Sequence, residues 1–286
     1  MKTPRELIRT YGIHPRRGLG QSFLIDRNII EKIVAGAGLS REDLVLEIGA
    51  GIGVMTRLIA ERVSAVTALE IDPVMVDLLQ RELSELTNVT IHHQDALTYE
   101  FPPATASEPG RGGIKVIGNI PYNISTQILF RLIQRRESVS EMVLMFQKEV
   151  ADRIMASPGS RDYGILSVMT DMYTIRSRIL TVPPGCFYPR PKVDSAVLKM
   201  RIREVPLRDI DDHELFLKVV KAAFSKRRKT LMNNLKDAEF LLSHHIDPRT
   251  LLDRLGIDGR RRGETLSCDE FGRLSAMIAV LQKERP

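Results

Sequence analysis

A short stretch in the middle of the chain combines an amide, a proline turn and an aromatic ring. It is Asn119-Ile120-Pro121-Tyr122, which follows the apolar residues 114–118. The amino nitrogen of adenine is a poor nucleophile because its lone pair is delocalised into the ring. The Asn119 oxygen and a backbone carbonyl near Ile120 could accept its N–H bonds and free the lone pair for methylation. Pro121 would fix the turn, and Tyr122 would offer a flat face to an unstacked base. An ordinary turn after a strand is the competing interpretation.

A glycine-rich turn indicates a nucleotide-like ligand. The turn is Glu47-Ile48-Gly49-Ala50-Gly51-Ile52-Gly53, between a predicted strand and a predicted helix, where the backbone can approach a ligand closely. Glu70 follows Gly49 by 21 residues and can accept both hydroxyls of a ribose. Nicotinamide and flavin enzymes also use glycine turns, but their usual third glycine is replaced here by Val54.

Three polar residues are predicted to end successive strands of one sheet. They are Glu70, Asp95 and Asn119, and Asp95 is placed to accept the amino group of an adenine. Because the carboxyl ends of parallel strands meet at one edge, all three should line the same crevice as the glycine turn. A surface role is the common alternative for any single aspartate.

The elements that must position these residues alternate between strand and helix. The pattern predicts helices at 27–36, 54–62, from 73, 125–134 and 148–155. It predicts strands at 44–48, 65–70, 89–91, 114–119, 141–147 and 198–202, with a loop at 102–113. Such alternation is typical of an α/β fold, a mostly parallel sheet with helices on both faces. From Asp211 onward the period is helical, and a capping box at residues 267–270 opens a last helix.

Composition narrows the class of protein. The chain has 286 residues, enough for about two domains, and 43% are hydrophobic. The sequence contains no apolar run of the ~18 residues that a membrane span needs and no secretory signal, so we expect a cytoplasmic protein. Two cysteines without paired spacing predict neither disulfides nor a thiolate metal site, and we expect no metal.

The predicted domains are a basic tail (residues 1–26), a catalytic domain (residues 27–204) and a helical domain (residues 205–286).

Positive charge is concentrated at the two ends of the chain. The net charge is +6, with +4 in residues 1–20, +4 in residues 201–286 and −2 between them. The candidate cations for a polyanionic partner are Arg16, Arg17, Lys221, Lys226, Arg227, Arg228 and Lys229. A run of charge is usually a solvated face, but two basic ends around an acidic centre favour nucleic acid.

Several motifs together resemble the small-subunit rRNA adenine dimethyltransferases, and the resemblance runs from about Gly18 to about Leu281. It rests on the glycine turn, Glu70, Asp95 and the stretch 119–123. It also rests on three further segments, Gly20-Gln21-Ser22-Phe23-Leu24, Phe187-Tyr188-Pro189-Arg190-Pro191-Lys192-Val193-Asp194-Ser195 and Phe224-Ser225-Lys226-Arg227-Arg228-Lys229. The second segment resembles the target-base loop of that family.

The resemblance implies a Rossmann-like class I methyltransferase sheet with a smaller all-α C-terminal domain, and S-adenosylmethionine as cofactor. The implied cofactor residues are Gln21, Ser22, Leu24, Gly49, Gly51, Glu70, Asp95 and Asn119. Tyr122 and Phe187 would sandwich the adenine, beside Asn119, Ile120 and Pro121. The implied substrate is two adjacent adenosines near the 3′ end of small-subunit rRNA, each dimethylated at N6, within a pre-ribosomal small subunit. We expect a monomer.

Two residues depart from the family pattern. Ser22 stands where Asn or His is usual, which would alter one cofactor hydrogen bond, and Ala50 replaces a common Pro, which would loosen the turn. Two alternatives stay open on this fold: an adenine methyltransferase for large-subunit rRNA or DNA, and a non-catalytic assembly or transcription factor. The intact Asn119-Ile120-Pro121-Tyr122 and Glu70 argue against the second.

Overall fold

The computed structural model describes residues 2–102 and 113–284, without the side chain of Arg17. The chain divides into two compact units. Unit 1 contains Met1–Ala151 and Arg176–Ile202, and unit 2 contains Asp152–Ile175 and Arg203–Pro286. The predicted boundary after residue 204 lies close to the end of unit 1. Residues 1–26, predicted as a separate tail, group with unit 1.

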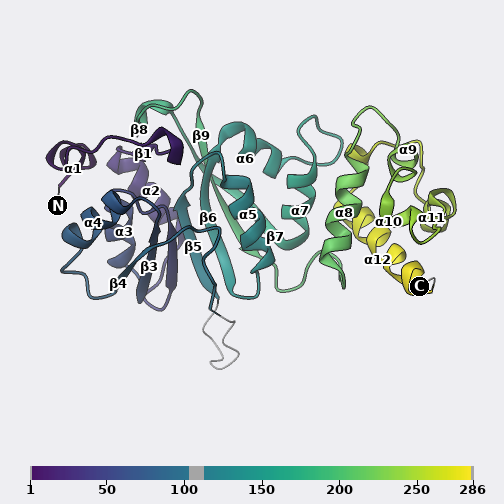
Figure 1. The fold of residues 1–286 in the computed structure, drawn as a ribbon, viewed down its shortest axis with the longest axis horizontal. Helices are drawn as coiled ribbons and strands as arrows, with labels where there is room; N and C mark the ends of the chain where they lie inside the picture. The colour runs from purple at the N-terminus through teal and green to yellow at the C-terminus, as the bar shows by residue number, and fades with distance from the viewer. Residues whose placement is uncertain (1, 103–112, 285–286) are drawn as a thin grey trace. The chain divides into compact units, whose positions relative to one another are not determined.

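Unit 1 is built on a seven-stranded sheet with the order β4-β3-β2-β5-β6-β9-β7 (Figure 1). Its strands are β2 (Leu44–Ile48), β3 (Ala65–Glu70), β4 (Val89–His93), β5 (Ile114–Asn119), β6 (Val139–Gln147), β7 (Thr174–Val182) and β9 (Ser195–Ile202). The first five pair in parallel, and β9 pairs antiparallel with β6. The predicted, mostly parallel sheet is confirmed.

Helices cover both faces of the sheet, and three of them connect its parallel strands. The helices are α2 (Arg27–Ala37), α3 (Val54–Ala60), α4 (Pro73–Glu82), α5 (Ser125–Gln134) and α6 (Lys148–Met155). From β2 the chain moves through β3 to β4 in one direction across the sheet, and from β5 to β6 in the other. Since such crossovers are right-handed, α3 and α4 lie on one face and α5 on the opposite face. The reversal between β2 and β5 opens a crevice at the carboxyl ends of the strands.

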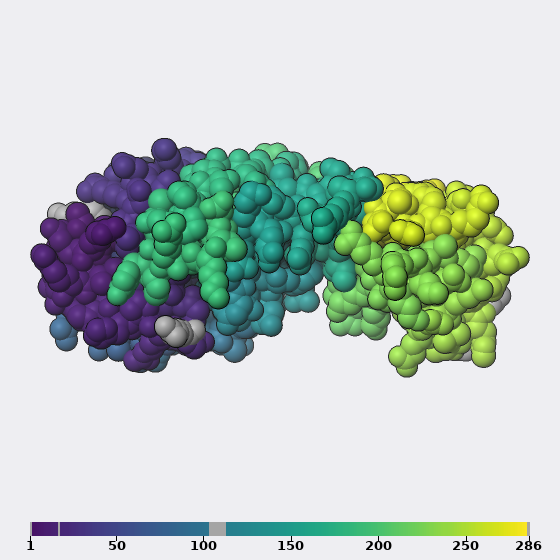
Figure 2. Space-filling view, turned by 90° about the horizontal axis from the view of Figure 1, so that it is seen from above, coloured from purple at the N-terminus to yellow at the C-terminus, as the bar shows by residue number. Residues whose placement is uncertain are grey.

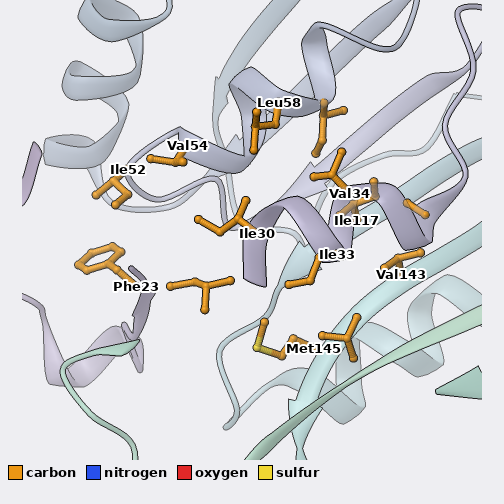
Figure 3. Close-up of a cluster of buried hydrophobic side chains, with 14 of the residues drawn as sticks. Phe23, Ile30, Ile33, Val34, Ile52, Val54, Leu58, Ile117, Val143 and Met145 are labelled. Atoms are coloured by element: carbon orange, nitrogen blue, oxygen red, sulfur yellow. The ribbon is translucent and has the colours of Figure 1, made fainter. Parts of the chain in front are cut away.

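The core between α2 and the sheet fixes this arrangement (Figure 3). Asp26 caps α2 by accepting hydrogen bonds from the backbone N–H groups of Asn28 and Ile29. The helix then buries its apolar face against β5 and β6, with Ile30, Ile33, Val34, Ile117, Val143 and Met145 in one cluster. Burying each such side chain contributes about 1.5–3 kcal/mol.

A small second sheet closes unit 1 beside the crevice. It pairs β1 (Phe23–Leu24) antiparallel with β8 (Phe187–Tyr188). Before β1 come α1 (Pro4–Thr10) and the short turn η1 (Arg17–Leu19), and before β8 comes η2 (Pro184–Cys186). Figure 2 shows the green segment that carries β8 beside the purple N-terminal residues. Residues far apart in sequence therefore meet at one edge of the crevice.

Unit 2 is helical. It contains α7 (Ile165–Tyr173), α8 (His213–Ala223), α9 (Leu231–Leu235), α10 (Glu239–Leu242), α11 (Pro248–Leu255), η3 (Gly263–Thr265) and α12 (Cys268–Glu284). The helix α12 packs against α7, α8 and α11, and the buried ring of Phe271 stacks on the partly buried ring of Phe224 with the ring centroids 5.8 Å apart. The predicted capping box is present: Ser267 Oγ accepts from Glu270 N–H, and Glu270 Oε2 accepts from Ser267 N–H.

The structure extends the predicted elements and adds several. The strands β4, β6 and β9 are longer than predicted, and α1, α7, β1, β7 and β8 were not predicted. Residues 152–175 group with unit 2 rather than with the predicted catalytic domain, because α7 packs on α8 and α12. Residues 103–112 of the predicted loop lie outside the described part. Within the described residues, every helix is too short or too polar to span a bilayer.

Candidate functional site

A cleft opens at the carboxyl ends of the strands of unit 1. Its lining includes ten of the predicted site residues: Gln21, Ser22, Gly49, Gly51, Glu70, Asp95, Asn119, Ile120, Pro121 and Tyr122. Strand ends and N-terminal residues that are distant in sequence thus form one site.

The glycine turn is held by a carboxylate. Glu70 Oε2 accepts a hydrogen bond from Gly51 N–H at 2.8 Å, and its Oε1 accepts from the N–H groups of Ile71 and Asp72 at 3.0 and 2.9 Å. Gly49 and Gly51 have φ values of 75° and 54°, which favour glycine. Glu70 therefore shapes the turn, in addition to any contact that it makes with a ligand.

Two buried carboxyls lie beside this turn. Burial raises the pKa of Glu70 above its usual value, although the three backbone N–H groups oppose that rise. Glu47 is 0% exposed, and neither of its oxygens has a hydrogen-bond partner among the described residues. Burial raises the pKa of Glu47 to about 8; the nearby Thr56 hydroxyl opposes that rise, and the charge of Glu70 adds a smaller increase. Glu47 is thus mostly protonated at neutral pH.

The amide of Asn119 has a fixed orientation at the end of β5. Its Nδ2 donates a hydrogen bond to the backbone oxygen of Ser22 at 2.9 Å. Because a carbonyl oxygen can only accept, this bond assigns the nitrogen and leaves Oδ1 as an acceptor for a bound donor. The side chain is therefore suited to hold an amino group.

Tyr122 is anchored through its hydroxyl group. The hydroxyl lies 2.6 Å from Oγ of Ser195, a fully buried residue at the start of β9. Burial raises the pKa of Tyr122, so the phenol stays neutral. The bond restricts the ring to one orientation at the wall of the cleft.

Two predicted residues lie outside the lining of the main cleft. Leu24 lines a smaller neighbouring pocket, together with Gly49 and Asn119. Phe187 is 3% exposed and packs in the same hydrophobic cluster as Phe23 and Ile30. The structure thus brings Tyr122 to the cleft but keeps the ring of Phe187 buried in this cluster.

Residues 16–24 are called here the N-terminal strap, and residues 19–23 of this strap form one wall of the cleft. Gln21 Nε2 donates to Asp72 Oδ2 at 2.8 Å, and Ser22 Oγ donates to the backbone oxygen of Pro189 at 3.1 Å. The side chains of both predicted cofactor residues are therefore engaged with other protein groups.

Asp95 lines the cleft, and Ala50 lies in the glycine turn. Asp95 follows β4, where one of its carboxylate oxygens accepts from Leu97 N–H at 2.8 Å. Ala50 N–H donates to the backbone oxygen of Leu69 at 3.3 Å, a bond that a proline could not make. This hydrogen bond opposes the loosening expected from the loss of the family's proline.

The predicted RNA-binding cations differ in their partners. Arg16 is 51% exposed and pairs with Asp72 at 3.3 Å. In unit 2, Lys226 pairs with Asp237 at 2.9 Å and Arg227 with Glu264 at 3.1 Å. Three exposed residues form no ion pair within the described ranges: Lys221, Arg228 and Lys229. The side chain of Arg17 is outside the described part.

Sequence reasoning missed three side chains at this site. Asp72 directly precedes Pro73, and an acid before a proline is a helix-start signal that could have identified it. Glu47 lies within the glycine motif, but its burial depends on the packed helix α3. No local signal indicates Ser195 as the partner of Tyr122, because 73 residues separate them.

Comparison with known proteins gives a consistent result. The family model described as "Ribosomal RNA adenine dimethylase" matches residues 13–271. The "Ribosomal RNA small subunit methyltransferase A" of Syntrophus aciditrophicus is 45% identical over 270 residues, which cover 94% of this chain and 96% of that protein.

Solved structures share the fold over most of the chain. A dimethyladenosine transferase from Plasmodium falciparum has a TM-score of 0.74 at 25% identity, covering 87% of this chain and 94% of that one. The 23S rRNA methyltransferase ErmE has a TM-score of 0.66 at 28% identity, covering 90% of this chain and 99% of that one.

Proposed function

Because the chain belongs to the ribosomal RNA adenine dimethylase family, we propose that it dimethylates N6 of two adjacent adenosines near the 3′ end of small-subunit rRNA. The chain is an rRNA adenine methyltransferase by that membership. One observation carries the finer proposal: a single cleft is lined both by Glu70 and Asp95 and by Asn119-Ile120-Pro121-Tyr122. A site for a nucleoside-containing methyl donor and a site for a base therefore adjoin.

The proposed methyl donor is S-adenosylmethionine, whose sulfonium makes its methyl group electrophilic. The residues around the cleft fit this molecule. Glu70 and Asp95 offer carboxylate oxygens to ribose hydroxyls and to an amino group, and the turn at Gly49 and Gly51 permits close approach of the backbone. Gln21, Ser22 and Leu24 contribute the opposite wall and its neighbouring pocket.

The proposed base site uses acceptors and a flat ring. Asn119 Oδ1 and the carbonyl near Ile120 accept from the amino group, and Pro121 restricts the turn between them. Tyr122 stacks on the adenine. Positioning and exclusion of water supply the rate enhancement, since a nitrogen held in line displaces the methyl group without a covalent enzyme intermediate. Phe187 joins this stack only if its ring is uncovered when RNA binds.

The proposed partner is a pre-ribosomal small subunit, bound by a monomer in the cytoplasm. The exposed cations Lys221, Arg228 and Lys229 offer contacts for RNA phosphates, with Lys226 and Arg227 nearby in sequence. The relative from Syntrophus aciditrophicus supports the small subunit, since it is 45% identical over 94% of this chain and is named as a small-subunit methyltransferase.

The test compares substrates directly. Purified protein with radiolabelled S-adenosylmethionine should methylate small-subunit particles from cells that lack the modification, with up to four methyl groups on two adenosines. Naked large-subunit rRNA and duplex DNA serve as competing substrates. Preferential incorporation into large-subunit rRNA would contradict the proposal, and absence of incorporation into any of the three would favour a non-catalytic role.

A further inference from the structure

A buried carboxylate next to the cleft has no part in the proposed chemistry. Asp72 is 2% exposed and lies between β3 and α4. Its Oδ1 accepts from Val74 N–H at 3.0 Å and lies 3.3 Å from Arg16, while its Oδ2 accepts from Gln21 Nε2 at 2.8 Å. Two of the three groups around this carboxylate thus belong to the N-terminal strap, about fifty residues earlier in the chain.

Hydrogen-bonding chemistry fixes the direction of every bond in this cluster. A carboxylate can only accept, so the Gln21 atom that faces Asp72 must be the amide nitrogen. A backbone N–H can only donate, so the Gln21 atom that accepts from Arg16 N–H at 2.8 Å must be the amide oxygen. Both ends of the Gln21 side chain are therefore bound to protein groups.

The hydrogen bonds of Asp72 connect the strap to the proposed cofactor site. The strap residues Leu19, Gly20, Gln21, Ser22 and Phe23 line the cleft. On the other side, the backbone N–H of Asp72 donates to Glu70 Oε1 at 2.9 Å. Asp72 therefore binds both the wall of the cleft and the carboxylate that shapes the glycine turn.

We propose that Asp72 is a positioning residue that holds the N-terminal strap over the cofactor cleft through Gln21. Asp72 does not touch the reacting atoms, and Gln21 acts through this anchor rather than by direct contact with the cofactor. The inference rests on the proposed function only in naming S-adenosylmethionine as the ligand of the cleft.

Capping of α4 is the competing explanation for the burial of Asp72. Asparagine separates the two roles, because it caps a helix as well as aspartate does. In Asp72→Asn the oxygen can still accept from Val74 N–H, whereas the amide nitrogen then faces the amide nitrogen of Gln21, donor against donor. Gln21→Glu places two carboxylates in contact instead. The double variant restores one donor and one acceptor with reversed direction.

The experiment measures two properties of the full chain for the wild type, Asp72→Asn, Gln21→Glu and the double variant. Calorimetry gives the affinity for S-adenosylmethionine, and hydrogen–deuterium exchange without ligand gives the protection of residues 16–24. Each single variant should bind about tenfold more weakly or worse, the usual effect of losing a charge-assisted hydrogen bond, and should lose protection in the strap. The double variant should recover most of the affinity and most of the strap protection. The melting temperatures of the variants should stay close to that of the wild type.

The outcomes separate the explanations. Unchanged affinity and protection in Asp72→Asn would overturn the proposal and leave capping as the role of Asp72. Persistent weak binding in the double variant, with strap protection restored, would mean that Gln21 contacts the cofactor directly, which also overturns it. A wild type that does not bind S-adenosylmethionine would contradict the proposed function, while the exchange measurement would still test the anchor.

Discussion

At the proposed cofactor end of the cleft, Glu70 accepts three backbone N–H groups, whereas at the base end Asn119 and Tyr122 are each held by one side-chain hydrogen bond. The cofactor end is therefore shaped largely by backbone of two neighbouring strand–turn–helix units, β2 to α3 and β3 to α4. The base end depends on partners from distant segments, Ser22 and Ser195. The difference predicts that substitutions at the cofactor end disturb binding and folding together, whereas substitutions at the base end disturb catalysis.

The largest effect is expected from Asn119→Ala. Losing the acceptor for the amino group should lower the single-turnover rate of methyl transfer by about 100- to 1,000-fold, as for other preorganised hydrogen-bonding groups. Affinity for S-adenosylmethionine, measured by calorimetry, should change much less. Wild-type turnover in this variant would remove the central claim about the base end.

Glu70→Ala should weaken S-adenosylmethionine binding by about 1.5–3 kcal/mol, the cost of losing charge-assisted hydrogen bonds. Because three N–H groups lose their acceptor, the melting temperature should fall as well. Calorimetric titration and thermal unfolding check the two parts. Near-unchanged affinity would place the cofactor carboxylate elsewhere, and Ser22→Ala, whose hydroxyl binds Pro189, is the control expected to have the smaller effect.

Substitutions of Phe187 test whether its buried ring stacks on the adenine. If it does, the ring contributes about 1–3 kcal/mol, so Phe187→Ala should lower methylation severely without changing cofactor affinity, and Phe187→Tyr or Phe187→Trp should keep much of it. Alanine also leaves a cavity worth about 3–5 kcal/mol of stability, which makes Phe187→Leu decisive. Stacking by Phe187 predicts a folded but inactive leucine variant, and an active one of normal stability would assign Phe187 to packing.

Glu47 should make stability depend on pH. Because burial raises the pKa of Glu47 from 4.5 to about 8 in the folded chain, the unfolded chain releases this proton more easily, so stability should fall as pH rises from about 4.5 to about 8. Glu47→Gln, which mimics the protonated form, should reduce that slope. Melting temperatures of both proteins between about pH 5 and about pH 9 check this, and parallel curves would contradict the assignment.

The smallest effects are expected in the basic segment of unit 2. Arg228→Ala with Lys229→Ala should flatten the salt dependence of RNA binding by about one log–log unit for each RNA phosphate that the variant no longer neutralises. Arg227→Ala should change the slope less, because Arg227 is paired with Glu264 and donates a hydrogen bond to the backbone oxygen of Arg161. An unchanged slope in the double variant would identify these residues as a solvated surface.

The sequence was sufficient where one local signal determines one local structure. The alternation of strands and helices, the glycine turn and the strand ends at Glu70 and Asn119 follow from periodicity and from residue types. The capping box at Ser267, before α12, was predicted from the same kind of signal.

Hydrogen-bond partners that are distant in sequence could not be predicted from such local signals. The sequence shows that Tyr122 and Gln21 are polar. It does not show that they form hydrogen bonds with Ser195 and Asp72, because this pairing depends on the complete packing of unit 1. The burial of Phe187 has the same origin, since it follows from pairing with Leu24 in a two-residue strand too short to produce a periodic signal. The helix α7 was missed because its residues are apolar on most sides, which gives no clear face.

The strap also sets an order of assembly during synthesis. Its hydrogen bonds with Asp72, Asn119 and Pro189 span 51, 97 and 167 residues, so a growing chain can form them only in that sequence. A nascent chain that ends before β8 already has the glycine turn, Glu70 and Asn119, but not the partner strand of β1. The strap can thus be held by all of its partners only after Pro189, far downstream in the chain, has been synthesised.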